Sequence, residues 1–135
     1  YMKKFSIYPV YNLEQFTHIY LSSNIVKSWI LKINGIITGF ASFVINNFQL
    51  YSVNYKIAEI MYYFAPDNIF YNLFQKILQE THVLKLDKIT IIDIMDNYKL
   101  VEKFKFQKSM KVNFQMYNYH HPTGIAKKKF AYNIV

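Results

Sequence analysis

The chain has 135 residues, 53% of them apolar and 19% aromatic, and it contains no cysteine. This length and apolar content predict one globular domain with a substantial core and argue against disorder. The lack of cysteine excludes a disulfide framework and a cysteine-based zinc site or nucleophile, and it favours a reducing, cytoplasmic location. Because no stretch reaches about 18 uninterrupted apolar residues, no membrane span is predicted, and the start of the sequence lacks the apolar core of a signal peptide.

The formal net charge is +8, and all sixteen basic residues are lysine. A basic chain raises nucleic acid or an anionic surface as a partner. Base reading and bidentate phosphate binding favour arginine, however, and no recognition-helix pattern is present. We therefore predict a solvated lysine surface and no nucleic-acid partner.

The first half of the chain reads as strand, helix and hairpin. Residues 6–10 are typical of a short strand, and residues 12–23 of a helix with Asn12 as its N-cap. Two β-branched and aromatic runs follow, at residues 26–33 and 36–45. They are separated by Asn34 and Gly35, a pair that tolerates the positive φ angles of a type I′ turn, so they predict a β-hairpin.

The second half continues with alternating elements. A strand at residues 55–65 precedes Pro66 and Asp67, where Asp67 is the predicted cap of a long helix with one broad apolar face. Residues 88–95 read as a strand buried on both faces, and a short helix should begin near Asp96 or Asn97. Two closing strands are predicted at residues 112–120 and 127–135.

This order of elements predicts an α/β (α+β) fold with a mixed, mostly antiparallel sheet and helices packed on it. It resembles the order of the GNAT acyltransferase fold, as one domain over residues 1–135. That fold holds the coenzyme A pyrophosphate on a glycine-rich junction that leads into the long helix, where backbone N–H groups face the phosphates. The junction at residues 62–74 has no glycine, Pro66 has no N–H, and Asp67 adds negative charge. We therefore expect this chain to bind no cofactor at that place.

Several motifs resemble the C-terminal half of protein N-myristoyltransferase, the glycylpeptide N-tetradecanoyltransferase. They are Asp93-Ile-Met-Asp-Asn97, Phe104-Lys-Phe106 and Met116-Tyr-Asn-Tyr119, and further upstream Thr38, Phe40, Ser42 and Phe43 on one strand with Tyr62 and Tyr63 on the next. They occur in collinear order from Val26 onward.

The resemblance implies transfer of a myristoyl group from myristoyl-CoA, the co-substrate, to the N-terminal glycine of a peptide or protein. This chain supplies the peptide-binding half, and a separate half binds the acyl-CoA. In that family the terminal carboxylate is the base that deprotonates the glycine amine, which here implies Val135. The residues that the resemblance implies for peptide binding are Asn47, Tyr62, Val112 and Phe114.

Two departures from the family bear on the substrate. An acidic loop that helps to bind basic peptides is replaced by a segment with Lys108 and Lys111. A peptide-contacting serine of the family corresponds to Asn47 or Phe48. Selectivity for basic peptides is therefore not expected here.

Other interpretations stay open. The chain is alternatively a catalytically inactive, stand-alone GNAT-like module that binds peptides or proteins, or a small acetyltransferase with an unusual CoA site. Self-association is a further alternative, because one half of a pseudo-symmetric pair exposes an apolar face. Val135 alternatively emerges at a sheet edge without a catalytic role. His120 and His121 are neighbours in a predicted strand and point to opposite faces, so we expect no metal site there.

Overall fold

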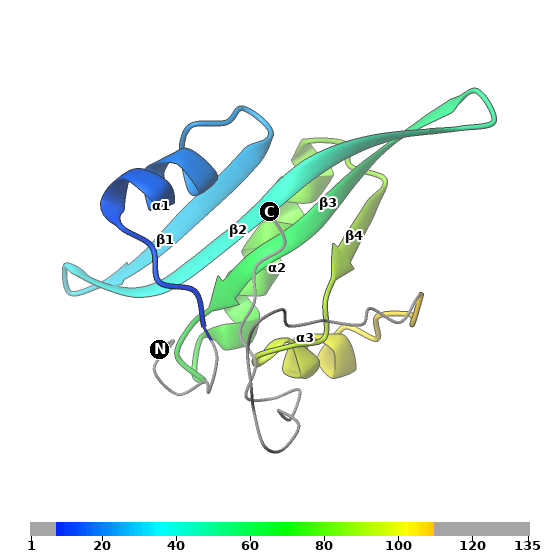
Figure 1. The fold of residues 1–135 in the computed structure, drawn as a ribbon. Helices are drawn as coiled ribbons and strands as arrows, with labels where there is room; N and C mark the ends of the chain where they lie inside the picture. The colour runs from blue at the N-terminus through cyan, green and yellow to red at the C-terminus, as the bar shows by residue number, and fades with distance from the viewer. Residues whose placement is uncertain (1–7, 110–135) are drawn as a thin grey trace, which may run out of the picture. The chain divides into compact units, whose positions relative to one another are not determined.

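The computed structural model describes residues 8–109 (Figure 1). Their elements, in chain order, are α1 (Leu13–Tyr20), β1 (Val26–Ile33), β2 (Ile36–Leu50), β3 (Val53–Phe64), α2 (Phe70–Val83), β4 (Lys88–Ile91) and α3 (Asn97–Lys103). The chain divides into a sheet unit over Pro9–Ile92 and a second unit that contains α3.

The sheet has four strands in the order β1-β2-β3-β4. The pairs β1–β2 and β2–β3 are antiparallel, whereas β3 and β4 are parallel and are connected through α2. A parallel pair needs a crossover of this kind, because its strands run in the same direction. The predicted fold class, α+β with a mixed and mostly antiparallel sheet, is confirmed.

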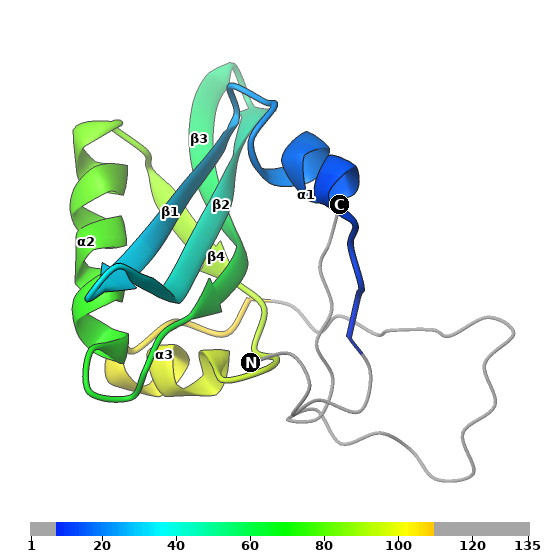
Figure 2. The same cartoon turned by 90° about the vertical axis from the view of Figure 1, so that its left-hand side faces the viewer.

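The two helices of the sheet unit lie on opposite faces of the sheet (Figure 2). The ring of Tyr20, at the end of α1, packs edge-on against Phe40 with centroids 5.6 Å apart. On the other face Tyr63 packs edge-on against Phe70 of α2 at 4.9 Å. These aromatic contacts place large buried rings on both sides of β2 and β3, which accounts for the core of this unit.

The start of α1 was correctly predicted. Asn12 is the N-cap, its side chain accepts a hydrogen bond from the Gln15 backbone N–H at 2.8 Å, and the Gln15 side chain accepts one from the Asn12 N–H at 3.0 Å. This reciprocal pair is a capping box. The helix ends at Tyr20, three residues before the predicted end.

One turn of the sheet was predicted and the other was not. Asn34 and Gly35 have φ angles of 51° and 80° and connect β1 to β2, as the sequence indicates. Tyr51 and Ser52, with φ angles of 48° and 69°, form a second turn with positive φ angles between β2 and β3. Since neither residue is a glycine or asparagine, the sequence carries no signal for it. Both strands are consequently longer than the predicted runs at residues 36–45 and 55–65.

Other predicted boundaries are corrected by the structure. The strand predicted over residues 88–95 ends at Ile91 as β4, and its residues are exposed or half-buried rather than buried on both faces. Tyr8–Val10 is not in a strand. The two closing strands, the histidine pair, Val112, Phe114 and Val135 lie outside the described residues.

Asp67 is not the side-chain cap of α2. The N-cap is Ile69, which makes no side-chain capping bond, because a turn of three residues intervenes after Pro66. Within that turn the backbone carbonyl of Asp67 accepts a hydrogen bond from the Phe70 N–H at 3.4 Å. The first helical turn is therefore stabilised by backbone bonds.

The close approach of β2 to its neighbours at Gly39 generates a prediction. A Cβ atom at Gly39 would lie 3.1 Å from the Phe64 carbonyl oxygen and 3.2 Å from the Leu31 Cβ. Because both neighbours belong to paired strands, Gly39→Ala should destabilise the fold by about 1–3 kcal/mol, measured by urea unfolding.

Gly35→Asn is the control for that substitution. Gly35 has nothing within 4 Å of an added Cβ, and asparagine tolerates its positive φ. We expect the free energy of unfolding to change by less than about 1 kcal/mol. Equal costs at both positions would contradict the steric explanation.

Candidate functional site

The candidate site is formed by β2 and β3, whose residues alternate between the two faces of the sheet. We call the side covered by Tyr20 the α1 face; it carries Phe40, Ser42, Tyr62 and Phe64. The opposite side, against α2, is the α2 face; it carries Ala41, Phe43, Ile60 and Tyr63.

An irregularity at Met61 sets this distribution. Ser42 pairs with Tyr62 and Phe43 pairs with Ile60, so Met61 is an extra residue on β3. Such a β-bulge changes the face on which every later side chain of the strand lies. It directs Tyr62 to the α1 face and Tyr63 to the α2 face.

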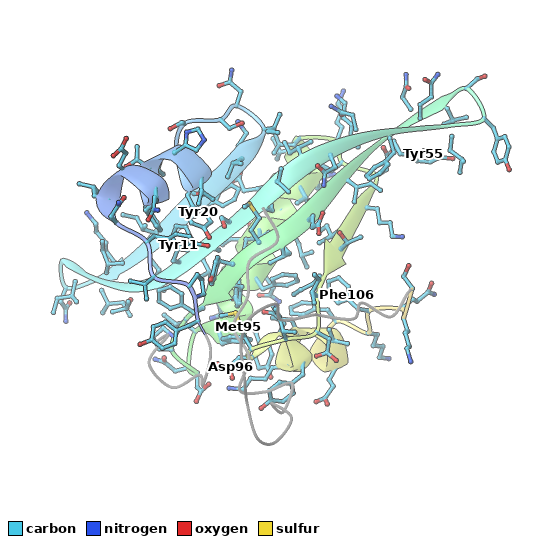
Figure 3. All side chains as sticks on the ribbon, viewed as in Figure 1. Tyr11, Tyr20, Tyr55, Met95, Asp96 and Phe106 are labelled. Atoms are coloured by element: carbon cyan, nitrogen blue, oxygen red, sulfur yellow. The ribbon has the colours of Figure 1, made fainter. Side chains whose placement is uncertain are left out.

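An aromatic cluster closes the α1 face at the α1 end. Tyr20 is 1% exposed, and its ring lies 4.8 Å from Phe16, 6.0 Å from Tyr11 and 5.8 Å from Tyr62, measured between ring centroids. Tyr11 and Tyr20 are seen side by side in Figure 3. The hydroxyl of Ser28 on β1 donates to the Tyr20 carbonyl at 2.9 Å. Ring packing and this hydrogen bond together hold α1 on the sheet.

Two hydroxyl groups are buried in this region without a hydrogen-bond partner among the described residues. They belong to Ser42 and Tyr62, which are opposite each other in the β2–β3 pairing. Burial raises the pKa of the Tyr62 phenol, and the nearby Tyr11 raises it further. The Tyr62 phenol therefore stays protonated, so it can donate a hydrogen bond but is unsuited to act as a base near neutral pH.

The hydroxyl of Tyr63 has a partner on the other face. It donates a hydrogen bond to the Phe70 carbonyl in the first turn of α2. Burial also raises the pKa of this phenol. Tyr63 therefore joins β3 to α2 through both its ring and its hydroxyl.

The structure places two of the predicted peptide-binding residues on different faces. Tyr62 is buried on the α1 face, whereas Asn47 is exposed and lies opposite Lys56 on the α2 face. Their side chains are therefore not brought together. Phe48, the other residue that corresponds to the family's serine, lies on the α1 face with Tyr62.

The distal part of the β2–β3 hairpin is two-faced, which the sequence reading missed. Its α1-face side chains are large and exposed, and its α2-face side chains are all polar. The former are Phe48, Leu50, Val53 and Tyr55, and the latter are Asn47, Gln49, Asn54 and Lys56. The signal was present as alternation, but of these residues only Tyr55 and Lys56 fall within a predicted strand.

The junction between β3 and α2 is poorly suited to bind a phosphate through backbone N–H groups. The Ile69 N–H donates to the Pro66 carbonyl at 3.1 Å, and the Phe70 N–H donates to Asp67 as described above. These two N–H groups are thus satisfied locally, whereas anion binding at a helix start uses N–H groups that point at the ligand.

Within residues 8–109 there is no group of three or more His, Cys, Asp or Glu side chains that could hold a metal ion. No helix in that range is long and apolar enough to cross a membrane.

Comparison with protein families gives one match across nearly the whole chain. Residues 1–134 match the family described as "Myristoyl-CoA:protein N-myristoyltransferase, C-terminal domain". No curated protein matches the sequence.

Solved structures show where else this fold occurs. A predicted acetyltransferase from Clostridium acetobutylicum, solved with acetyl-CoA, is 16% identical with a TM-score of 0.66, over 85% of this chain and 82% of that chain. The aminoglycoside N-acetyltransferase AAC(6')-Iy in complex with CoA is 14% identical with a TM-score of 0.57, over 76% and 83%. Glucosamine-6-phosphate N-acetyltransferase from Arabidopsis thaliana is 12% identical with a TM-score of 0.59, over 78% and 76%. At these identities the likeness shows the fold, which is GNAT-like.

The neighbouring tyrosines of β3 should respond oppositely to loss of the hydroxyl. Tyr63→Phe removes the bond to the Phe70 carbonyl and should cost about 1–2 kcal/mol of unfolding free energy. Tyr62→Phe removes a buried hydroxyl that makes no hydrogen bond of good geometry and only a weaker interaction with Tyr11, so it should be neutral or stabilising by up to about 1 kcal/mol. Urea unfolding of both variants measures this, and a larger loss in Tyr62→Phe would show that its hydroxyl has a partner.

The raised pKa of Tyr62 also predicts a pH dependence. In the unfolded chain the phenol ionises near pH 10, whereas in the folded chain it ionises only at higher pH. Its contribution to stability is therefore complete below about pH 10 and is lost as the pH rises above that value. Unfolding free energies measured between pH 9 and 11 should fall less steeply in Tyr62→Phe than in the wild type. Gly35→Asn, which removes no titratable group, is the control and should leave the slope unchanged.

Proposed function

Because this chain belongs to the family of the C-terminal domain of myristoyl-CoA:protein N-myristoyltransferase, we propose that it is the peptide-binding half of an N-acyltransferase. The reaction is transfer of a myristoyl group from myristoyl-CoA to the N-terminal glycine of a peptide or protein. The family match over residues 1–134 is the observation that carries this proposal. The GNAT-like fold is consistent with it, since several acetyltransferases share that fold.

The acyl-CoA is proposed to bind to a separate half. The chemistry of the β3–α2 junction supports this division, because Pro66 offers no N–H and the Ile69 and Phe70 N–H groups are already used. A cytoplasmic setting supplies acyl-CoA and agrees with a chain without cysteine.

The proposed chemistry needs a base and an acyl donor. The carboxylate of Val135 takes a proton from the glycine ammonium, and the freed amine nitrogen attacks the thioester carbonyl carbon. The amide bond forms as the carbon–sulfur bond breaks, coenzyme A leaves as the thiolate, and this thiolate takes up the second proton that the amine nitrogen loses. Asn47, Tyr62, Val112 and Phe114 remain the proposed peptide contacts, with Phe48 added because it shares the α1 face with Tyr62. Because Tyr62 is only 6% exposed, its contact with the peptide is limited to a small part of its side chain.

The second candidate is a peptide- or protein-binding module without catalysis. The exposed apolar side of the distal hairpin favours it, because a binding surface is useful without an acyl-CoA site. The two candidates differ in one observable, the formation of a new amide bond.

Intact-mass spectrometry tests the proposal. The untagged chain is incubated with myristoyl-CoA and a glycine-initiated peptide, alone and with a candidate acyl-CoA-binding half. Addition of one myristoyl group to the peptide is expected, and it should be lost when a short Gly-Ser tail is added after Val135, because the carboxylate is then displaced.

The same tail placed before Tyr1 is the matched control and should leave transfer intact. Transfer that survives the C-terminal tail would rule out the Val135 carboxylate as the base. Peptide binding without transfer under any condition would favour the binding module.

A further inference from the structure

The distal hairpin, which we define as residues 47–56, extends beyond the strands on either side of it (Figure 1). β1 pairs with β2 only as far as Val44, and β4 pairs with β3 only from Ile57 onward. Within the described part of the chain, both edges of the distal hairpin thus have no strand beside them.

Backbone hydrogen bonds show which groups face these edges. The Ile45 N–H donates outward to the Ile25 carbonyl at 2.8 Å, so Ile45 faces the β1 side. Because strand residues alternate in direction, the N–H and C=O groups of Asn47 and Gln49 face the same edge. Lys56 faces the other side, where its N–H donates to the Asp87 carboxylate and its carbonyl accepts from the Asp87 N–H, each at 2.8 Å. The free edge of β2 is therefore the longer one.

The face beside that edge is apolar and open to solvent. Phe48 is 54% exposed, Leu50 56%, Val53 51% and Tyr55 39%. Figure 3 shows Tyr55 far along the hairpin from Tyr11 and Tyr20, which belong to the covered end of the sheet. An apolar face next to unpaired backbone groups matches a polypeptide strand, which bonds through its main chain and places every second side chain on one face.

Two other occupants fit this surface less well. A lipid bilayer would leave the edge N–H and C=O groups of Asn47 and Gln49 without partners in hydrocarbon, which is costly. A second copy of the chain would find too little apolar surface. The exposed area of the four side chains is roughly 300–400 Å², judged from the 150–250 Å² of an aromatic side chain, whereas a stable dimer buries about 800 Å² per partner.

We propose that the β2 edge at Asn47 and Gln49 binds an extended segment of the acceptor polypeptide as an added strand. The side chains at alternating positions of that segment are apolar and pack on Phe48 and Leu50. The proposal rests on the proposed function, because it assigns the segment to the acceptor. It also explains a role for Asn47 through its backbone, although its side chain lies on the face away from Tyr62.

The charge of the hairpin specifies the segment further. No acidic residue occurs between Asn46 and Lys56. On the α1 face Glu59 lies on β3 outside the distal hairpin, and its carboxylate oxygen accepts a hydrogen bond from the Asn46 side chain at 3.0 Å. A basic segment would thus find little attraction here, and an uncharged alternating one is preferred.

Fluorescence anisotropy with two labelled peptides tests the face. Both begin with glycine; one carries Val and Phe at alternating positions, and the other carries Ser there. The wild-type chain should bind the apolar peptide at least about tenfold more tightly. Val53→Thr combined with Phe48→Thr should abolish that preference, whereas Asn54→Thr, next to Val53 but on the polar face, should preserve it. Circular dichroism confirms that each variant is folded.

Backbone methylation of the apolar peptide tests the edge. Two methylated versions of the peptide are compared, each with N-methyl groups at every second residue. In one version the methyl groups replace the N–H hydrogens that would face β2, and in the other, shifted by one residue, they replace those that would face solvent. Only one of the two versions should weaken binding by about tenfold or more. Equal effects of both versions, or equal binding of the apolar and serine peptides, would overturn the proposal.

Two further assays would show whether a membrane or a second copy of the chain binds the distal hairpin instead of a peptide. Cosedimentation with phosphatidylcholine–phosphatidylserine vesicles that depends on Phe48 and Val53, without peptide selectivity, would replace the peptide by a membrane. Sedimentation that shows a dimer dependent on the same residues would replace it by a second copy. Because these assays contain no acyl-CoA, selective binding without acyl transfer refutes only the proposed function. Transfer without selectivity refutes only the added strand.

Discussion

The extra residue at Met61 is the constraint on which the organisation of the sheet unit depends. In a regular ladder the odd-numbered residues of β3 would all lie on one face, so Tyr63 would share a face with Tyr55. The bulge reverses the order: Tyr62 turns toward Tyr20 and α1, and Tyr63 turns toward Phe70 and α2. Consecutive strand residues always face opposite sides, so the inserted residue decides which tyrosine packs against which helix.

The two ends of the β2–β3 hairpin consequently have different roles. At one end the α1 face is closed by rings that are almost fully buried, and this end supplies the stability of the unit. At the other end the same face stays apolar but is uncovered, while the α2 face becomes polar. Apolar side chains beyond the part covered by α1 do not contribute to the core. The open stretch is therefore interpreted as a binding surface.

Much of the fold could be predicted from local sequence signals, and the site could not. Asn12 with Gln15 and Asn34 with Gly35 have a local physical meaning, so they were identified correctly. The turn at Tyr51 and Ser52 and the helix ends at Lys85 and Lys105 place ordinary residues at positive φ, where the sequence gives no signal because glycine is absent. The separation of Asn47 from Tyr62 depends on the bulge, whose position depends on packing against both helices.

The edge and the face contribute differently to the binding proposed for the distal hairpin. Water satisfies the N–H and C=O groups of Asn47 and Gln49 in the free protein, so replacing it with peptide groups yields only a small net gain. Covering Phe48 and Leu50 removes apolar surface from water and yields more. Affinity should therefore come mainly from the face, whereas the edge fixes the direction and register of the bound segment. A one-residue shift of that segment would turn its apolar side chains toward the polar face, so the two-faced hairpin selects a pattern of alternation more strongly than any particular residue.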